Sequence, residues 1–186
     1  MSLTPSNMLS LGNKMPDFVL PEPAKNSAKY STSQIAEDHS VVVAFICNHC
    51  PYVIHLADWL SMLAIDYQDK KVTIIGINSN DVENYPADSP QNMVAEVTLR
   101  GYVFPYLYDE TQEVAKEFQA ACTPDFYLFN SERQLVYRGQ FDDSRPGNGK
   151  PITGSDLRAA INATLVGEAP DSEQKPSIGC NIKWKR

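Results

Sequence analysis

The chain has 186 residues, of which 42% are hydrophobic and 21% are charged, so its composition is globular rather than disordered. Its 23 acidic and 16 basic residues give a formal charge of -7, which argues against nucleic-acid and anionic-membrane partners. No apolar run is long enough to span a membrane, and the first residues lack the charged and apolar regions of a signal peptide. We therefore expect a cytoplasmic protein that binds neither nucleic acid nor membranes.

The first part of the chain alternates strand and helix patterns. Residues 1–16 indicate a lead-in, and strands are predicted at residues 17–20, 41–46 and 72–77. The strand at 41–46 is apolar on both faces, which is typical of the middle of a sheet. Apolar residues then recur every three or four positions from 53 to 67, which predicts a helix with Pro51 in its first turn. The strand–helix–strand order indicates a parallel, right-handed crossover.

The middle of the chain carries an insertion at residues 79–101. It begins as a polar loop and ends as a helix that Ser89 caps and Gly101 terminates. A short strand is predicted at residues 104–108, and Asp109 is predicted to cap the helix that follows.

The last third predicts a hairpin, a helix and a tail. The hairpin strands are residues 126–129 and 135–137, the helix runs from about 155 to 166, and the tail is 167–186. Parallel strands followed by an antiparallel hairpin, with helices between and after them, describe a mixed-sheet α/β domain. The order is that of a thioredoxin-like fold, and we expect residues 1–186 to form a single domain.

The sequence Cys47-Asn48-His49-Cys50 follows a buried strand and opens a helix. Its spacing brings the two sulfurs close enough to form a disulfide bond, and a helix N-terminus stabilises a thiolate. His49 can add positive charge or donate a hydrogen bond. From this position we predict that Cys47 is the exposed nucleophile, and that the more buried Cys50 resolves the mixed disulfide.

Two other interpretations of these cysteines stay open. They could be inert core residues, since free cysteine packs like a small hydrophobe. Alternatively, Cys47, His49 and Cys50 could bind zinc with Cys122 or Cys180 as a fourth ligand. The sequence lacks the second Cys-x-x-Cys pair that zinc sites usually have, so we predict no metal and no organic cofactor.

A second candidate feature is Cys122-Thr123-Pro124, directly before the first hairpin strand. A proline that enters a strand through a tight turn is a candidate for a cis peptide bond, although a trans bond is the ordinary alternative. In a thioredoxin-like fold this proline faces the cysteine pair. Thr123 and Pro124 are therefore candidate substrate-binding residues, and Cys122 is a candidate third redox thiol near Cys47.

Three motifs resemble the peroxiredoxin-like branch of the thioredoxin superfamily, within the alkyl hydroperoxide reductase/thiol-specific antioxidant grouping. They are residues 47–53, 122–126 and 178–185, and residues 16–20 are similar to the entry strand of that grouping. The resemblance covers residues 12–186. It implies a thioredoxin-like fold with a redox-active centre and a role in antioxidant defence or cell redox homeostasis.

The chain departs from true peroxiredoxins at the positions that handle peroxide. Their peroxidatic cysteine follows the pattern Pro-x-x-x-Thr-x-x-Cys, and by position it corresponds to Cys50. Cys47 then occupies the place of the threonine and Val43 that of the proline, and no arginine lies between Gly101 and Arg133. Without the hydroxyl and guanidinium groups that polarise peroxide, fast peroxidase chemistry is disfavoured.

Cys180 lies in the tail. If the tail folds back onto the domain, Cys180 reaches the active centre as a resolving thiol, whereas a frayed terminus would make this cysteine incidental. Ile182 and Trp184 favour docking, because a disordered end would leave both side chains in water.

The sequence thus predicts a dithiol oxidoreductase with Cys47 as nucleophile and Cys50 as resolver. Its expected partners are a protein or small-molecule disulfide and a reductant that regenerates the dithiol. One alternative is a thiol peroxidase in which Cys50 is peroxidatic and a second cysteine resolves it. The other is a non-enzymatic redox sensor or metal-binding module.

Overall fold

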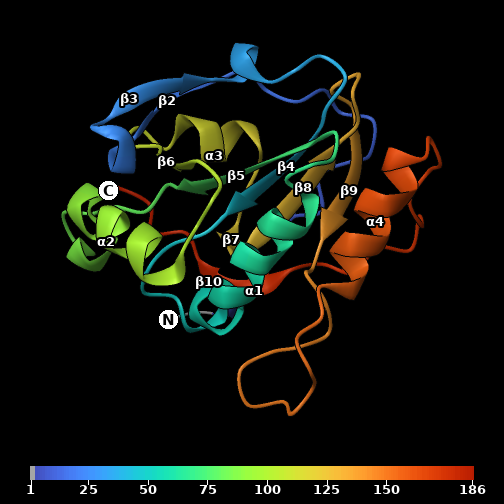
Figure 1. Cartoon of the computed structure of the whole chain (residues 1–186). Coiled ribbons are helices and arrows are strands. Elements are labelled where there is room, and N and C mark those ends of the chain that lie inside the picture. Colours follow the sequence, from blue (N-terminus) through green and yellow to red (C-terminus); the bar gives the residue numbers. More distant parts are fainter. Residues whose placement is uncertain (1–2) are drawn as a thin grey trace.

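The computed structural model describes residues 3–186, with a mixed five-stranded sheet at its centre (Figure 1). The strands follow the order β6-β5-β4-β8-β9. Their bounds are Ser40–Phe45 (β4), Val72–Asn78 (β5), Tyr106–Tyr108 (β6), Asp125–Phe129 (β8) and Leu135–Gly139 (β9). β5 is parallel to β4 and β6, whereas β8 is antiparallel to β4 and β9. This is the mixed α/β sheet that the sequence predicts.

Helices cover both faces of the sheet. They are α1 (Pro51–Tyr67), α2 (Pro90–Arg100), α3 (Glu113–Glu117) and α4 (Ser155–Leu165). All six residues of β4 are buried, as expected of a central strand. Ala44 belongs to the core under α1 and α4, which lie on the same face in Figure 1, and Val43 belongs to the core under α3 and the N-terminal segment. None of these helices, within the described residues, is long and apolar enough to cross a membrane.

The two ends of the chain form a second, smaller sheet. β10 (Ile178–Asn181) pairs antiparallel with both β1 (Leu3–Pro5) and β7 (Cys122–Thr123). The docked tail is confirmed: Ile182 is buried and its N–H donates to the carbonyl of Ala121, although Trp184 stays 40% exposed. The lead-in, predicted as a loose segment, instead contributes an edge strand, and residues 1–2 of that segment lie outside the described part.

Gly179 permits the close contact between β10 and β7. A Cβ atom at this position would clash with the carbonyl group of Thr123, which is backbone and cannot rotate away. The register then places Cys180 opposite Thr123. The Ile-Gly-Cys-Asn segment of the tail can therefore pair closely with β7 because it has a glycine at position 179.

The predicted strands are confirmed to within two residues at each end, and three predicted elements differ in detail for clear reasons. The strand predicted at 17–20 is β2 (Val19–Glu22), which runs through Pro21 because it is paired only with β3 (Ala28–Ser31) in a two-stranded hairpin. The sequence predicts Asp109 as the N-cap residue of α3, but that position is Gln112. The helix begins four residues after Asp109, whose carboxylate reaches forward to accept the N–H of Ala115. Finally, only the last three residues of the strand predicted at 104–108 form β6.

Three short 3₁₀ helices complete the structure. They are η1 (Pro23–Lys25), η2 (Thr32–Gln34) and η3 (Pro86–Asp88). The last of these lies within the 79–101 insertion, just before α2. Ser89 caps α2 by accepting the N–H of Asn92, and Gly101 ends the helix at a φ of 64°, as the sequence predicts.

Candidate active site

The Cys-Asn-His-Cys turn connects β4 to α1. Cys50 is the N-cap residue of α1, and Cys47 lies four residues before the helix begins at Pro51. Cys47 is 2% exposed and Cys50 is fully buried. The prediction that Cys47 lies exposed at the helix mouth is therefore wrong, because the turn places Cys50 at the helix end and buries both sulfurs.

A buried carboxylate from the insertion holds this turn. Asp88 Oδ1 accepts the backbone N–H groups of Asn48 and His49, at 2.8 and 3.3 Å. Asp88 Oδ2 accepts hydrogen bonds from Nδ1 of His49 at 2.6 Å and from Nδ2 of Asn80 at 2.8 Å. A fully buried carboxylate with four N–H donors fixes the backbone of the motif and the orientation of its histidine.

His49 is placed by this carboxylate and by an aromatic ring. Its imidazole stacks on Tyr85 at a centroid distance of 5.7 Å. The hydrogen bond to Asp88 raises the pKa of His49 above its ordinary value, although partial burial opposes that shift. The protonated ring then adds positive charge near Cys50, in the role that the sequence suggests.

Cys50 faces the tail and the cis-proline loop. Its Sγ lies 2.8 Å from Sγ of Cys180 and 3.2 Å from the carbonyl oxygen of Thr123. The Thr123–Pro124 peptide bond is cis, and Sγ of Cys47 lies 3.4 Å from the hydroxyl of Thr123. The fold thus brings the predicted substrate-binding loop and the tail cysteine to the Cys-x-x-Cys turn.

Hydrogen bonds make Cys50 the most acidic of these thiols. As a thiol, Cys50 donates to Sγ of Cys180; once Cys50 loses its proton, the thiols of Cys47 and Cys180 become donors to its sulfur. Together with the N–H of Val53 at the start of α1, these donors lower the pKa of Cys50 to about 5, against the opposing effect of burial. The same bond to Cys50 raises the pKa of Cys47, and burial together with the negative charge of Asp88 raises it further.

Cys122 stands apart from the other three cysteines. Its thiol donates to the carbonyl oxygen of Pro124 at 3.6 Å, and burial raises its pKa far above the ordinary value. A buried thiol that stays protonated is a weak nucleophile. The structure therefore groups Cys47, Cys50 and Cys180, and gives Cys122 the surroundings of a core residue.

One cluster in the described residues has donor atoms close enough to bind a metal ion. It consists of Cys47, His49 and Asp88, whose ligand atoms lie within 4.8 Å of one another. Both oxygens of Asp88 already accept N–H groups, and one of them holds Nδ1 of His49. A metal ion would have to break these bonds, so this donor set fits a hydrogen-bonded thiol site better than a metal centre.

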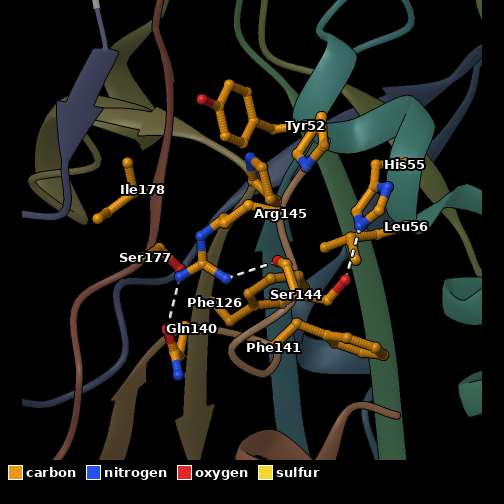
Figure 2. A pocket seen from close by; sticks show the side chains of 12 residues that line it. Tyr52, His55, Leu56, Phe126, Gln140, Phe141, Ser144, Arg145, Ser177 and Ile178 are labelled. Atoms are coloured by element: carbon orange, nitrogen blue, oxygen red, sulfur yellow. Dashed lines mark hydrogen bonds between the residues drawn. The ribbon is translucent and has the colours of Figure 1, made fainter. Parts of the chain in front are cut away.

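A pocket is lined in part by Pro124 of the cis-proline loop and Ile178 of β10 (Figure 2). Its lining residues are Tyr52, His55, Leu56, Pro124, Phe126, Gln140, Phe141, Ser144, Arg145, Pro146, Ser177 and Ile178. The loop at residues 140–154, between β9 and α4, contributes its polar side. His55 is half-buried here, with Nε2 at 2.8 Å from the hydroxyl of Ser144.

Sequence reasoning missed two residues of this region. Asp88 sits 38 positions beyond Cys50, inside an insertion whose residues give no sign that they contact the motif. Arg145 lies beyond the interval between Gly101 and Arg133, where the arginine of true peroxiredoxins would be expected. Both are placed by long-range packing, and no local pattern of hydrophobic or polar residues marks them.

Comparison with known proteins identifies the family. A family model described as Redoxin matches residues 10–160. The chain belongs to the Redoxin family. Its membership supports an oxidoreductase that works through thiols and confirms the resemblance to the thioredoxin superfamily. No curated protein gives a significant match.

Solved structures extend this likeness to the full length of the Redoxin-family chain. An uncharacterized conserved protein from Geobacillus kaustophilus shares 52% identity, with a TM-score of 0.96 and coverage of 100% of this chain and 97% of that chain. A hypothetical protein from Sinorhizobium meliloti 1021 shares 47% identity, with a TM-score of 0.95 and 98% coverage of each chain.

More distant structures confirm the thioredoxin-like fold alone. A secreted disulfide oxidoreductase from Mycobacterium tuberculosis, described as homologous to E. coli DsbE, is 16% identical to this chain. The match has a TM-score of 0.60 and covers 78% of this chain and 95% of that chain.

Proposed function

We propose that this Redoxin-family protein is a thiol–disulfide oxidoreductase in which Cys50 supplies the attacking thiolate. The position of Cys50 carries the proposal: it is the N-cap residue of α1, and hydrogen bonds with Cys47 and Cys180 favour its thiolate. This assignment exchanges the roles predicted from the sequence. The reason is that the hydrogen bond to Cys50, burial and the charge of Asp88 all raise the pKa of Cys47, whereas hydrogen bonds lower the pKa of Cys50.

The reaction has two exchange steps. The Cys50 thiolate attacks one sulfur of a substrate disulfide, which breaks the S–S bond and releases the first substrate thiolate. Cys180 or Cys47 then loses its proton and attacks Sγ of Cys50, which releases the second substrate thiolate and leaves a disulfide within the protein. Two electrons pass to the substrate, and an external dithiol reductant returns them to the protein.

Cys180 is the better placed resolving thiol. Its sulfur lies 2.8 Å from that of Cys50. The sulfur of Cys47, by contrast, also contacts the hydroxyl of Thr123. The contact with Cys180 also covers the sulfur of Cys50, which has no exposed surface. Substrate therefore needs a local opening of β10, which is held to its neighbours by short pairings and can open without global unfolding.

The proposal is tested by mapping the bonds formed in one turnover. The reduced protein would receive one equivalent of bis(2-hydroxyethyl) disulfide, followed by acid quench, alkylation and non-reducing peptide mapping. We expect every protein disulfide to contain Cys50, with Cys50–Cys180 the main product. Cys50→Ser should abolish exchange, whereas Cys122→Ser, the matched buried control, should react like the wild type.

Two results would count against this assignment. Exchange that continues in Cys50→Ser with a Cys47 mixed disulfide would return the nucleophile to Cys47. A folded wild-type protein that forms no disulfide with any of its thiols would remove the enzymatic proposal altogether.

The Cys50–Cys180 contact also favours a second candidate, a thiol peroxidase. The Cys50 thiolate would attack hydrogen peroxide to give a sulfenic acid and hydroxide, and the thiol of Cys180 would condense with the sulfenic acid to release water. Rapid peroxide consumption with a trapped Cys50 sulfenate in Cys180→Ser would favour this reaction. Faster exchange with disulfides than with peroxide would favour the oxidoreductase.

We propose the cytoplasm as the compartment. A dithiol that reduces its substrate works where thiols are kept reduced, and that environment is typical of the cytoplasm. Cell fractionation followed by immediate alkylation would test this. Recovery of the protein outside the cytoplasm would contradict it.

A further inference from the structure

Three residues that line the pocket in Figure 2 lie within two positions of Cys50, Thr123 or Cys180 in the sequence. Tyr52 lies two residues after Cys50, and Pro124 follows Thr123. Ile178 precedes Cys180 by two residues, which is one strand repeat. A group attached to the sulfur of Cys50 would therefore extend towards this pocket when β10 opens.

The pocket contains a guanidinium that neutral oxygens hold in place. Nη1 of Arg145 donates to the carbonyl oxygens of Asp142 and Ser144, at 2.6 and 2.7 Å. Nη2 donates to Oε1 of Gln140 at 2.5 Å, and Figure 2 shows the group directed towards Gln140 and Ser144. These bonds orient the guanidinium but leave its positive charge uncompensated.

The carboxylates nearest in sequence are engaged with other groups. The side chain of Asp142 accepts the N–H of Ser144, and the side chain of Asp143 pairs with Lys175 at 2.9 Å. Within residues 3–186 the structure gives Arg145 no ion pair with a carboxylate. In a protein of net charge -7, a guanidinium that is fixed by neutral oxygens without a direct ion pair, in a pocket that Pro124 and Ile178 also line, is a specific feature rather than an effect of composition.

The rest of the lining mixes apolar and polar groups, and the closed structure leaves a volume of only about 10 Å³ here, so a substrate enters this site only when β10 opens. Phe126, Leu56 and Phe141 supply apolar surface, while His55 and Ser144 add polar atoms beside it. Such a mixture binds a short carbon chain and fixes its polar end. An anion with two oxygens matches the planar fork of a guanidinium.

We propose that this pocket is a substrate subsite, in which Arg145 binds the carboxylate of an anionic organic disulfide whose sulfur Cys50 attacks. The inference rests on the proposed oxidoreductase and defines its substrate class. The carboxylate belongs either to a small disulfide or to an acidic peptide. The shared chemistry is a carboxylate a few bonds from a disulfide sulfur.

Three small disulfides of similar size separate charge from reactivity. They are 3,3′-dithiodipropionate with two carboxylates, bis(2-hydroxyethyl) disulfide with none, and cystamine with two ammonium groups. Their second-order rate constants for exchange with the reduced protein would be measured at pH 7 and low salt. We expect the wild-type protein to react fastest with the anion and slowest with the cation, against the direction that its net charge would impose.

Arg145→Gln should lower the ratio of the anionic to the neutral rate constant by about tenfold, as expected for loss of a charged hydrogen bond. Arg158→Gln is the control for charge, because it removes the same charge from α4, where Arg158 pairs with Asp66, donates to the carbonyl of Thr153 and lies over the Tyr67 ring. Arg145→Lys keeps the charge without the fork and should give an intermediate ratio. The neutral disulfide should react with Arg158→Gln as it does with the wild type, and for the Arg145 variants its rate constant is the denominator that cancels any general effect on the site.

The outcomes are distinguishable. If the wild type prefers cystamine, or if Arg145→Gln and Arg145→Lys both keep the wild-type ratio, the subsite is refuted while the oxidoreductase stands. If the ratio falls equally in Arg158→Gln, a long-range field accounts for the preference and the subsite is again refuted. If no disulfide reacts with the wild type, the proposed function itself fails. An acidic peptide disulfide that outpaces dithiodipropionate in the wild type, but not in Arg145→Gln, would identify the peptide source.

Discussion

Cys47 and Cys180 both contact the sulfur of Cys50, but the chain brings them there by different means. Cys47 belongs to the same turn, and Asp88 holds the backbone of that turn. Cys180 is 130 residues away in the sequence and arrives on β10, through its pairing with β7 and β1. One thiol is thus positioned by a buried charge, and the other by strand register.

The two supports meet at one side chain in the loop after β5. Nδ2 of Asn80 donates to the carboxylate of Asp88, and its Oδ1 accepts the backbone N–H of Lys183 just beyond β10, both at 2.8 Å. Nζ of Lys183 also lies 5.5 Å from the centre of the Tyr85 ring, whose other contact is His49. The comparison teaches that the insertion organises both thiols, although it contributes no sulfur.

The largest effect should come from disturbing the register of β10. Gly179→Ala places a Cβ against the carbonyl of Thr123, so the strand must move away from β7. We expect faster alkylation of Cys50 and a large loss of the Cys50–Cys180 disulfide, both measured by peptide mass spectrometry. Gly149→Ala is the control, since it has a φ of 70° but open space around its Cβ. Unchanged labelling in Gly179→Ala would show that β10 does not cover Cys50.

A smaller effect should follow from removing the charge that holds the turn. Asp88→Asn loses the ion pair with His49 and turns a donor towards other donors, which should cost about 1–3 kcal/mol of unfolding free energy. The pKa of His49 should fall and that of Cys50 should rise, because the positive charge near the thiolate is lost. Thiolate absorbance and histidine NMR titrations measure the two shifts. If Cys50 titrates in Asp88→Asn as it does in the wild type, Asp88 has no influence on the acidity of the attacking thiol.

The third and mildest test uses pH alone. The pKa of Cys50 falls from an ordinary value near 9 to about 5 on folding, so the folded protein holds its thiolate where the unfolded chain is protonated. This contribution is full above about pH 9 and is lost as pH falls towards 5. Urea unfolding across that range should show a steeper pH dependence in the wild type than in Cys50→Ser. Equal slopes would mean that Cys50 is not a thiolate in the folded protein.

Local patterns predicted most of the scaffold. The apolar residues at 41–46 and 72–77 form β4 and β5, and the capped segment ending at Gly101 is α2 with its predicted bounds. These features are readable because burial on two faces, helical periodicity and caps act over a few residues. The Cys-x-x-Cys motif at a helix start and the cis bond before Pro124 were visible for the same reason.

Tertiary structure alone decided how the thiols are used. The sequence could place Cys50 near a helix, but not show that Cys180 would donate to it or that Asp88 would favour a neutral Cys47. Hydrogen bonding and burial set a thiol's acidity. The hydrogen bond from Cys47 in the same turn lowers the pKa of Cys50 most, but Cys180, which adds to this effect, lies 130 residues away, and Asp88, which raises the pKa of Cys47, lies 38 residues beyond Cys50. Arg145 reaches the pocket on a loop whose course depends on the packed ends of β9 and α4. The sequence therefore determined the fold and the motif, whereas long-range packing selected the thiolate, its resolving partner and the charge beside it.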